Sequence, residues 1–188
     1  MPVTIDSFHN WYLSHYYGKL RSLFEYYVSP YVLSDESRSS IHEIVPRIYL
    51  GDIRVAHNKE KLDSLGITHV VIAVVGVPPP FPDDYKYMNV DLCDVQEEDI
   101  KKHFSDVHSF IDDALRTPEN KVLIHCMKGA SRSATLVASY IMRVNDVPLQ
   151  EAIQSMKEKR PVVNPNVGFM EQLEKYDMGL RATKSCLF

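Results

Sequence analysis

Short apolar runs alternate with longer amphipathic stretches from residue 41 onward. The run at 68–75 is rich in β-branched residues, which is typical of a strand buried on both faces. Apolar residues spaced three and four positions apart predict helices between such runs. We expect strands at 47–51, 68–75, 86–92 and 122–124, and helices at 56–65, 100–115, 133–144, 147–159 and 166–178. This alternation indicates an α/β fold, with a central, mostly parallel twisted sheet and helices on both faces.

The first 31 residues form a different region, which contains nine aromatic residues. Apolar positions in this region recur at helical spacing and predict an N-terminal helical extension: Phe8, Tyr12, Tyr16, Leu20, Leu23 and Tyr27. A polar, serine-rich linker is expected at 32–40, because it shows no periodicity. The main domain then covers 41–178, and a tail covers 179–188.

Three uses of this aromatic helix are open: packing on its own domain, pairing with a second copy as a homodimer, or lying on a membrane. We favour the first and place the homodimer second. Membrane attraction would be weak, because only Lys19 and Arg21 are basic there, against Asp6 and Glu25.

Composition excludes several classes of protein. Hydrophobic residues make up 45% of the 188 residues and charged residues 24%, which is ordinary for a globular protein. The net charge of −4 does not suggest a protein that binds nucleic acid electrostatically. The longest apolar run is far shorter than the ~20 residues of a membrane span, and no secretory signal is visible. The three cysteines, Cys93, Cys126 and Cys186, fit neither a disulfide scaffold nor a zinc site. We therefore expect an intracellular location, cytoplasmic or nuclear.

The segment His125-Cys-Met-Lys-Gly-Ala-Ser-Arg-Ser133 connects a buried strand to a helix. A tight loop at a helix N-terminus directs backbone N–H groups inward and forms an anion-binding cradle. Cys126 lies at its base, where such a field favours the thiolate. Arg132 lies at the start of the expected helix, and its planar guanidinium is suited to bind two phosphoryl oxygens. Gly129 permits the close backbone turn. A buried cysteine followed by chance by an arginine does not explain this arrangement, so the loop predicts a thiolate that attacks phosphorus.

Such a reaction needs an acid for the leaving oxygen. Asp91, Asp94 and Asp99 all follow the strand expected at 86–92. Asp91 falls at the strand end and Asp99 at a helix start, which leaves Asp94 in a loop that is free to swing over a substrate. Asp94 is therefore the candidate acid.

The sequence resembles a known family at these residues. His125-Cys126-x5-Arg132-Ser133 is similar to the signature of the cysteine-dependent protein tyrosine phosphatases, in the small, stand-alone (atypical) dual-specificity branch. The similarity extends over about 41–177, and the stretches that carry it are Ile44-Val-Pro-Arg-Ile-Tyr-Leu-Gly51, Leu65-Gly-Ile-Thr-His-Val70, Ser131-Arg-Ser-Ala-Thr135 and Asn164-Pro-Asn-Val-Gly-Phe-Met-Glu-Gln-Leu173.

The resemblance implies a role for each residue of the site. Cys126 would form a phosphocysteine, while Arg132 and the loop amides of Met127, Lys128, Gly129, Ala130 and Ser131 hold the phosphoryl group. Asp94 would protonate the leaving oxygen and then deprotonate the attacking water. Ser133 would stabilise the departing thiolate, His125 would orient the loop, and Asn166 would brace it. No metal or other cofactor is implied, because the cradle itself stabilises charge.

Each of three further residues allows two interpretations. The Lys128 side chain could either select highly anionic substrates or only extend into solvent, and we favour the second interpretation. Arg160 contacts a second phosphate or serves as a helix C-terminal charge, and the latter is preferred. Cys93 could trap an oxidised Cys126 as a disulfide, but a passive thiol is the better expectation.

The sequence therefore predicts a phosphatase for phosphotyrosine and phosphoserine or phosphothreonine in proteins, with a kinase activation loop as one conceivable substrate. Two alternatives stay open. One keeps the chemistry on a phosphoinositide or other phospholipid, and the other is a pseudophosphatase that binds phosphoproteins without cleaving them.

Overall fold

The computed structural model describes residues 40–185. The expected N-terminal helix and linker at 1–39 and the last three residues lie outside the described residues. The described elements, in chain order, are β1 (Ile41–Val45), β2 (Ile48–Gly51), α2 (Ile53–Ala56), α3 (Lys59–Leu65), β3 (His69–Ile72), β4 (Lys86–Asn89), the 3-10 turn η2 (Lys101–His103), α4 (Phe104–Leu115), β5 (Val122–His125), α5 (Arg132–Asn145), α6 (Leu149–Lys159) and α7 (Val167–Ser185).

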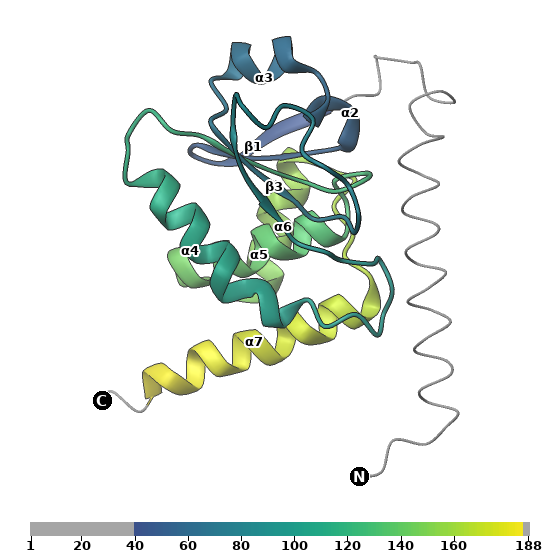
Figure 1. Ribbon diagram of the computed structural model, residues 1–188. Helices are drawn as coiled ribbons and strands as arrows, with labels where there is room; N and C mark the ends of the chain where they lie inside the picture. The colour runs from purple at the N-terminus through teal and green to yellow at the C-terminus, as the bar shows by residue number, and fades with distance from the viewer. Residues whose placement is uncertain (1–39, 186–188) are drawn as a thin grey trace.

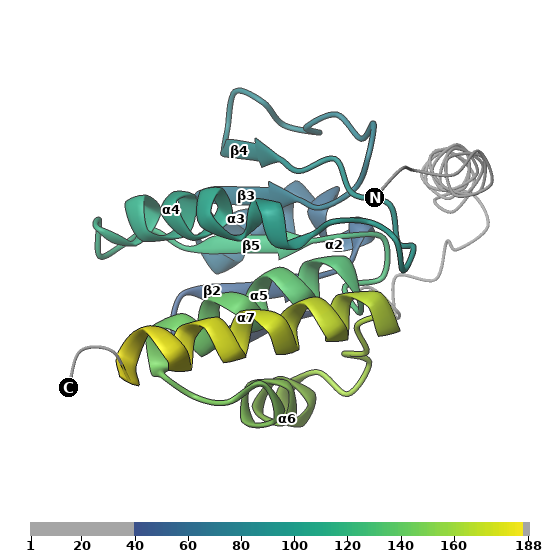
Figure 2. The ribbon, with the colours of Figure 1, turned by 90° about the horizontal axis from the view of Figure 1, so that it is seen from below.

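Five strands form one sheet in the order β1-β2-β5-β3-β4, and Figure 2 shows β2, β5, β3 and β4 side by side in this order. Strand β1 pairs antiparallel with β2, and the other neighbours are parallel. The central strand β5 is wholly buried, as its aliphatic sequence predicts. Its last residue, His125, lies level with Gly51 of β2 and Ile72 of β3. The chain therefore leaves β5 in the middle of the carboxyl edge, which is where ligands bind in such sheets.

Helices cover both faces of the sheet, as the alternating pattern predicts. The β2-to-β3 crossover carries α2 and α3, and the β4-to-β5 crossover carries α4 and runs the opposite way along the sheet. Right-handed connections therefore place them on opposite faces. Figure 1 shows α3 above the strands of the sheet and α4 below them. Helix α5 packs against α4, α6 and α7, so these four helices form one layer.

Several element boundaries differ from the sequence predictions. The strands expected at 68–75 and 86–92 end early, at Ile72 and Asn89. Strand β1 is missing from the predictions, because its residues do not alternate cleanly and a bulge interrupts it. The helix expected at 56–65 begins only at Lys59, because the side chain of Asn58 caps α3, and a separate short helix, α2, which Asp52 caps, precedes it. Helix α7 continues beyond the expected residue 178 to Ser185.

The turn that ends α3 is confirmed. Gly66 follows α3 in the left-handed conformation, with φ of 72°, which only glycine adopts at little cost.

Among residues 40–185, no helix combines the length and apolar character that crossing a bilayer requires.

Candidate active site

The loop after β5 is the cradle that the sequence predicts. It runs from Cys126 to Ser131, and α5 begins at Arg132. Gly129 has a φ of 63°, and a Cβ there would collide with the carbonyl of Gly51. The loop therefore needs glycine at this position for both conformation and space. On its outer side, the carbonyl of Met127 accepts a hydrogen bond from the amide of Ile53 (3.2 Å). The carbonyl of Ala130 likewise accepts one from the amide of Asn164 (2.8 Å).

Cys126 lies buried at the base of this loop. Its Sγ accepts hydrogen bonds from the Ser133 hydroxyl (3.1 Å) and the Gly129 amide (3.3 Å). Burial alone would raise the pKa of the Cys126 thiol, but the Arg132 charge and the hydrogen bonds from Ser133 and Ala130 outweigh it. The net effect lowers the pKa below that of an ordinary cysteine. The loop thus favours the thiolate, which is the nucleophilic form.

Arg132 provides a buried positive charge beside the cysteine. Its side chain is only 3% exposed, and its Nη1 donates to the carbonyl of Leu92 (3.3 Å). Its Nε is buried without a hydrogen-bond partner among the described residues and lies 3.8 Å from Oδ2 of Asp94. A buried guanidinium with an unused donor is suited to bind an oxyanion, since the bound anion would supply the missing acceptor.

Asp94 faces the same site from the loop after β4. Its Oδ1 accepts hydrogen bonds from the Ser131 hydroxyl (2.6 Å) and from Nδ2 of Asn166 (2.9 Å). This finding differs from the expectation of a carboxylate that is free to swing, because two side chains already hold it beside Arg132. The carboxylate is still 38% exposed, so a leaving group can reach it.

The start of α7 holds the loop that carries Asp94. The side chain of Gln172 donates to the carbonyl of Glu98 (2.8 Å) and accepts from the amide of Lys101 (3.0 Å). Gly168 packs so closely against Gln96 that a Cβ would collide with the Gln96 carbonyl. The position of the candidate acid is therefore built into the fold.

Asn166 has the bracing position that the resemblance implies, and it makes more contacts than expected. Its backbone amide donates to the Ser131 hydroxyl (3.2 Å), and its Oδ1 accepts from the amide of Phe169 (3.0 Å), which caps α7. Together with the contact to Asp94, these bonds join α7, the acid loop and the phosphate loop.

The other two aspartates are placed elsewhere. Asp91 accepts a hydrogen bond from the Gly76 amide (3.2 Å), two residues beyond the last residue of β4. Asp99 accepts from the Lys102 amide (3.4 Å) at the start of η2, a capping contact as expected. Neither has a described contact with Cys126 or Arg132, so Asp94 is the carboxylate of this run that the fold brings to the cysteine.

His125 and Lys128 also take distinct positions. His125 is fully buried, and its Nδ1 lies 3.4 Å from the Cys126 carbonyl oxygen. Burial lowers its pKa to about 3, so the ring is neutral at ordinary pH, in keeping with an orienting role. The Lys128 side chain is exposed, in agreement with the solvated reading.

Arg160 lies at the C-terminal cap of α6, as the preferred interpretation expects, but its side chain has a further role. It is buried, and its guanidinium donates to the carbonyls of Lys128 and Gly129 in the phosphate loop. A second phosphate could not reach it without displacing these bonds. Sequence reasoning missed this role, because Arg160 lies 31 residues from Gly129 along the chain. Sequence reasoning also missed the contact of the Ser131 hydroxyl with Asp94. Ser131 occupies the N-cap position of α5, but its side chain makes no capping hydrogen bond there and is directed to Asp94 instead.

No group of three or more possible metal ligands lies together within residues 40–185. Cys93 and Cys126 are both buried thiols.

Comparison with known proteins agrees with this geometry. Residues 48–178 match the family model described as dual specificity phosphatase, catalytic domain. The chain is 39% identical over 142 residues to MAP kinase phosphatase with leucine-rich repeats protein 3 of Dictyostelium discoideum, covering 75% of this chain and 16% of that relative. It is 34% identical over 146 residues to Dual specificity protein phosphatase 1B of Arabidopsis thaliana, covering 78% and 87%.

Among solved structures, the human tyrosine phosphatase-like serine/threonine/tyrosine-interacting protein is similar, with a TM-score of 0.69 and 34% identity. The similarity covers 73% of this chain and 95% of that one. The chain thus spans most of two of these proteins, but only a small part of the Dictyostelium relative.

Proposed function

This chain belongs to the dual-specificity phosphatase family, and we propose that it hydrolyses phosphotyrosine and phosphoserine or phosphothreonine in proteins through a phosphocysteine intermediate. One observation supports the assignment of roles above all others. The fold brings a thiol with a lowered pKa, an arginine with an unused donor and a held carboxylate to one loop.

In the first step, the Cys126 thiolate attacks phosphorus while the bond to the leaving oxygen breaks. Arg132 and the loop amides bind the equatorial phosphoryl oxygens, where charge accumulates. Asp94, in its acid form, transfers its proton to the leaving oxygen of the side chain. The products are a dephosphorylated protein, a phosphocysteine and an Asp94 carboxylate.

In the second step, water attacks the same phosphorus atom. The Asp94 carboxylate accepts the proton of this water, and the bond between sulfur and phosphorus breaks. The Ser133 hydroxyl, 3.1 Å from Sγ, donates to the departing thiolate and stabilises it. Inorganic phosphate leaves, and the resting site returns.

The proposed substrates are phosphorylated proteins. Two relatives carry the name MAP kinase phosphatase, which makes a phosphorylated kinase activation loop the first substrate class to test. The chain covers 16% and 19% of those relatives, so their other regions could determine their choice of substrate.

The test compares kcat/KM on matched peptides that carry phosphotyrosine or phosphothreonine at one position, with Cys126→Ser as the inactive control. We expect turnover of both peptides by the wild type. The absence of phosphothreonine turnover would refute dual specificity. Wild-type activity no greater than that of Cys126→Ser, on peptides and on a small aryl phosphate, would refute the enzyme and leave a binding protein. Phosphate release from phosphoinositide vesicles but not from peptides would assign a lipid substrate.

A further inference from the structure

Arg160 is the C-cap residue of α6 and has only 1% of its surface exposed. Its guanidinium is enclosed by acceptors from two separate segments. Nε donates to the Gly129 carbonyl (2.8 Å) and Nη2 to the Lys128 carbonyl (2.9 Å). Nη1 faces the carbonyl and hydroxyl oxygens of Ser40 (3.1 and 2.7 Å) and Nδ1 of His42 (3.0 Å). The planar fork therefore holds two consecutive carbonyls of the phosphate loop.

These two carbonyls determine where two amides of the loop point. The described residues contain no cis peptide bond, so the C=O of each residue is antiparallel to the N–H of the next across one rigid plane. The carbonyl of Lys128 shares its plane with the amide of Gly129, which donates to the Cys126 sulfur (3.3 Å). The carbonyl of Gly129 shares its plane with the amide of Ala130, whose hydrogen bond helps to lower the pKa of Cys126.

Arg160 itself is fixed from behind the loop. Asp52, the cap of α2, attracts the guanidinium and accepts a hydrogen bond from the Ser40 amide (3.3 Å). Burial and the neighbouring Arg160 charge lower the pKa of His42, so its neutral ring can offer Nδ1 as an acceptor. These contacts restrict the orientation of the guanidinium. The two peptide planes that it holds are therefore restricted as well.

We propose that Arg160 is a positioning residue of the phosphate cradle. It does not touch the substrate; it holds the peptide groups of 128–129 and 129–130 so that their N–H groups face the thiolate and the bound phosphoryl oxygens. Donors that are already oriented need no rearrangement when charge develops, and that is the condition for strong electrostatic stabilisation. The inference deepens the proposed function and rests on it for its catalytic meaning, but its effect on Cys126 and on anion binding is measurable without turnover.

A purely structural role is the alternative, and Arg47 supplies a matched control. Nη1 of Arg47 also donates to backbone carbonyls at the C-terminal end of α4 and just beyond it, those of Leu115, Thr117 and Pro118. Loss of either arginine removes carbonyl contacts, but only Arg160 holds carbonyls of the phosphate loop. A difference between the two variants therefore isolates the positioning effect from loss of stability.

The experiment uses full-length wild type, Arg160→Met, Arg160→Lys and Arg47→Met. Alkylation of Cys126 by iodoacetamide is followed against pH, with the labelled cysteine identified by mass spectrometry. Orthovanadate binding is measured as protection of Cys126 from this alkylation, and thermal unfolding shows that each variant is folded. In Arg160→Met, we expect half-protection to need about tenfold more orthovanadate, a smaller loss than removal of a donor would cause. The alkylation profile should also move to higher pH.

Arg160→Lys should lie between these values and the wild type, because one ammonium keeps the charge without the fork that binds two carbonyls. Arg47→Met should keep the wild-type profile and protection even if its unfolding temperature falls. A folded Arg160→Met with wild-type alkylation and protection would overturn the proposal. If that variant does not fold, wild-type values in Arg160→Lys would overturn it. Arg160→Met could change the alkylation and protection of Cys126 while the wild type turns over no phosphopeptide. That outcome would reject the proposed function but support the positioning role of Arg160.

Discussion

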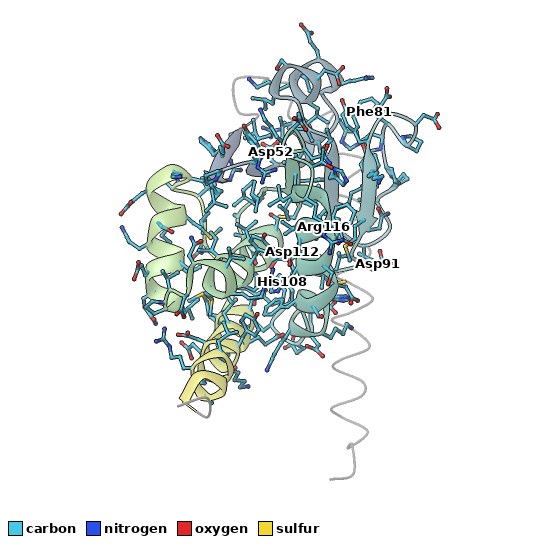
Figure 3. All side chains as sticks on the ribbon, turned by 90° about the vertical axis from the view of Figure 1, so that its left-hand side faces the viewer. Asp52, Phe81, Asp91, His108, Asp112 and Arg116 are labelled. Carbon is cyan, nitrogen blue, oxygen red and sulfur yellow. The ribbon has the colours of Figure 1, made fainter. Side chains whose placement is uncertain are left out.

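Helix α5 carries two polar clusters, and they are built in opposite ways. At its far end, polar groups pair with one another: Nε2 of His108 with the Ser139 hydroxyl (2.9 Å), the Tyr140 hydroxyl with Asp112 (2.9 Å), and Arg143 with the same carboxylate (2.7 Å). His108 and Asp112 both come from α4 (Figure 3). At its N-terminal end, Nε of Arg132 and, on the preceding strand β5, Nε2 of His125 are buried without hydrogen-bond partners among residues 40–185.

This difference separates polar groups that stabilise the fold from groups available to a ligand. A buried donor without an acceptor lowers stability, so it persists only where something else selects for it. Substitutions at the N-terminal end of α5 should therefore reduce catalysis with little loss of stability, and substitutions at the far end should do the reverse.

The largest expected effect follows from Asp94→Asn. The amide can still accept from Ser131 and Asn166, so the loop keeps its position, but it cannot donate a proton to the leaving oxygen. We expect kcat on a phosphotyrosyl peptide to fall by about 10²- to 10³-fold, the usual contribution of general acid catalysis. Steady-state kinetics at neutral pH measure this loss, and the unfolding temperature should change little.

The leaving group provides the internal control for this variant. Nitrophenolate leaves without much help from a proton, so Asp94→Asn should affect p-nitrophenyl phosphate far less than the peptide. Equal losses on both substrates would contradict the acid role. Asp91→Asn is the matched control, because Asp91 contacts only the Gly76 amide among its described hydrogen bonds, and its turnover should stay at the wild-type level.

Ser133→Ala should have the next largest effect. The variant loses the 3.1 Å hydrogen bond to Sγ of Cys126, one of the contacts that lower the pKa of this thiol. Less thiolate is then present at a given pH, and the thiolate leaves the phosphocysteine less readily. We expect kcat to fall about tenfold, as the loss of one hydrogen bond to a charged group suggests. Alkylation of Cys126 should also need a higher pH.

Ser139→Ala makes the same substitution on the same helix at the other cluster. It should unfold at a lower temperature, because Nε2 of His108 loses its partner, but keep the kcat and the alkylation profile of the wild type. An unchanged alkylation profile in Ser133→Ala, or a loss of kcat in Ser139→Ala, would end the distinction between the two clusters.

The sequence predicts the centre of this site better than its surroundings. Cys126 and Arg132 lie at the two ends of one short connection, and the buried aliphatic strand before it together with the helix after it predicts their placement. The contacts that hold this loop join distant residues instead: Ser131 to Asp94 across 37 positions, and Arg160 to Ser40 across 120. No local periodicity carries such pairings, because they depend on how the finished elements pack. In the sequence, Arg160 has the position of an ordinary charge at a helix end. Only the packing of the folded protein buries its side chain and directs it to the carbonyls of the phosphate loop.

The smallest effect on catalysis is expected from His108, whose pKa burial lowers to about 4, with the Arg143 charge adding to the shift. The Ser139 hydroxyl donates to the Leu136 carbonyl (2.8 Å), so it accepts from Nε2–H of a neutral His108. Between pH 6.5 and 4 the unfolded chain binds a proton here that the folded chain does not, and stability therefore falls as pH falls through this window. At pH 5 this group alone should remove about 2 kcal/mol relative to pH 7.5.

His108→Gln tests this sign, because glutamine can still donate to Ser139 but cannot bind the proton. Urea unfolding at pH 7.5 and pH 5 should show a loss of stability that is about 2 kcal/mol smaller in the variant than in the wild type. All other residues are the same in both proteins, so the difference between the two losses isolates His108. Turnover at pH 7 should be the same in both, since the far end of α5 has no contact with Cys126. An equal loss of stability in the two proteins would show that His108 is not buried in its neutral form.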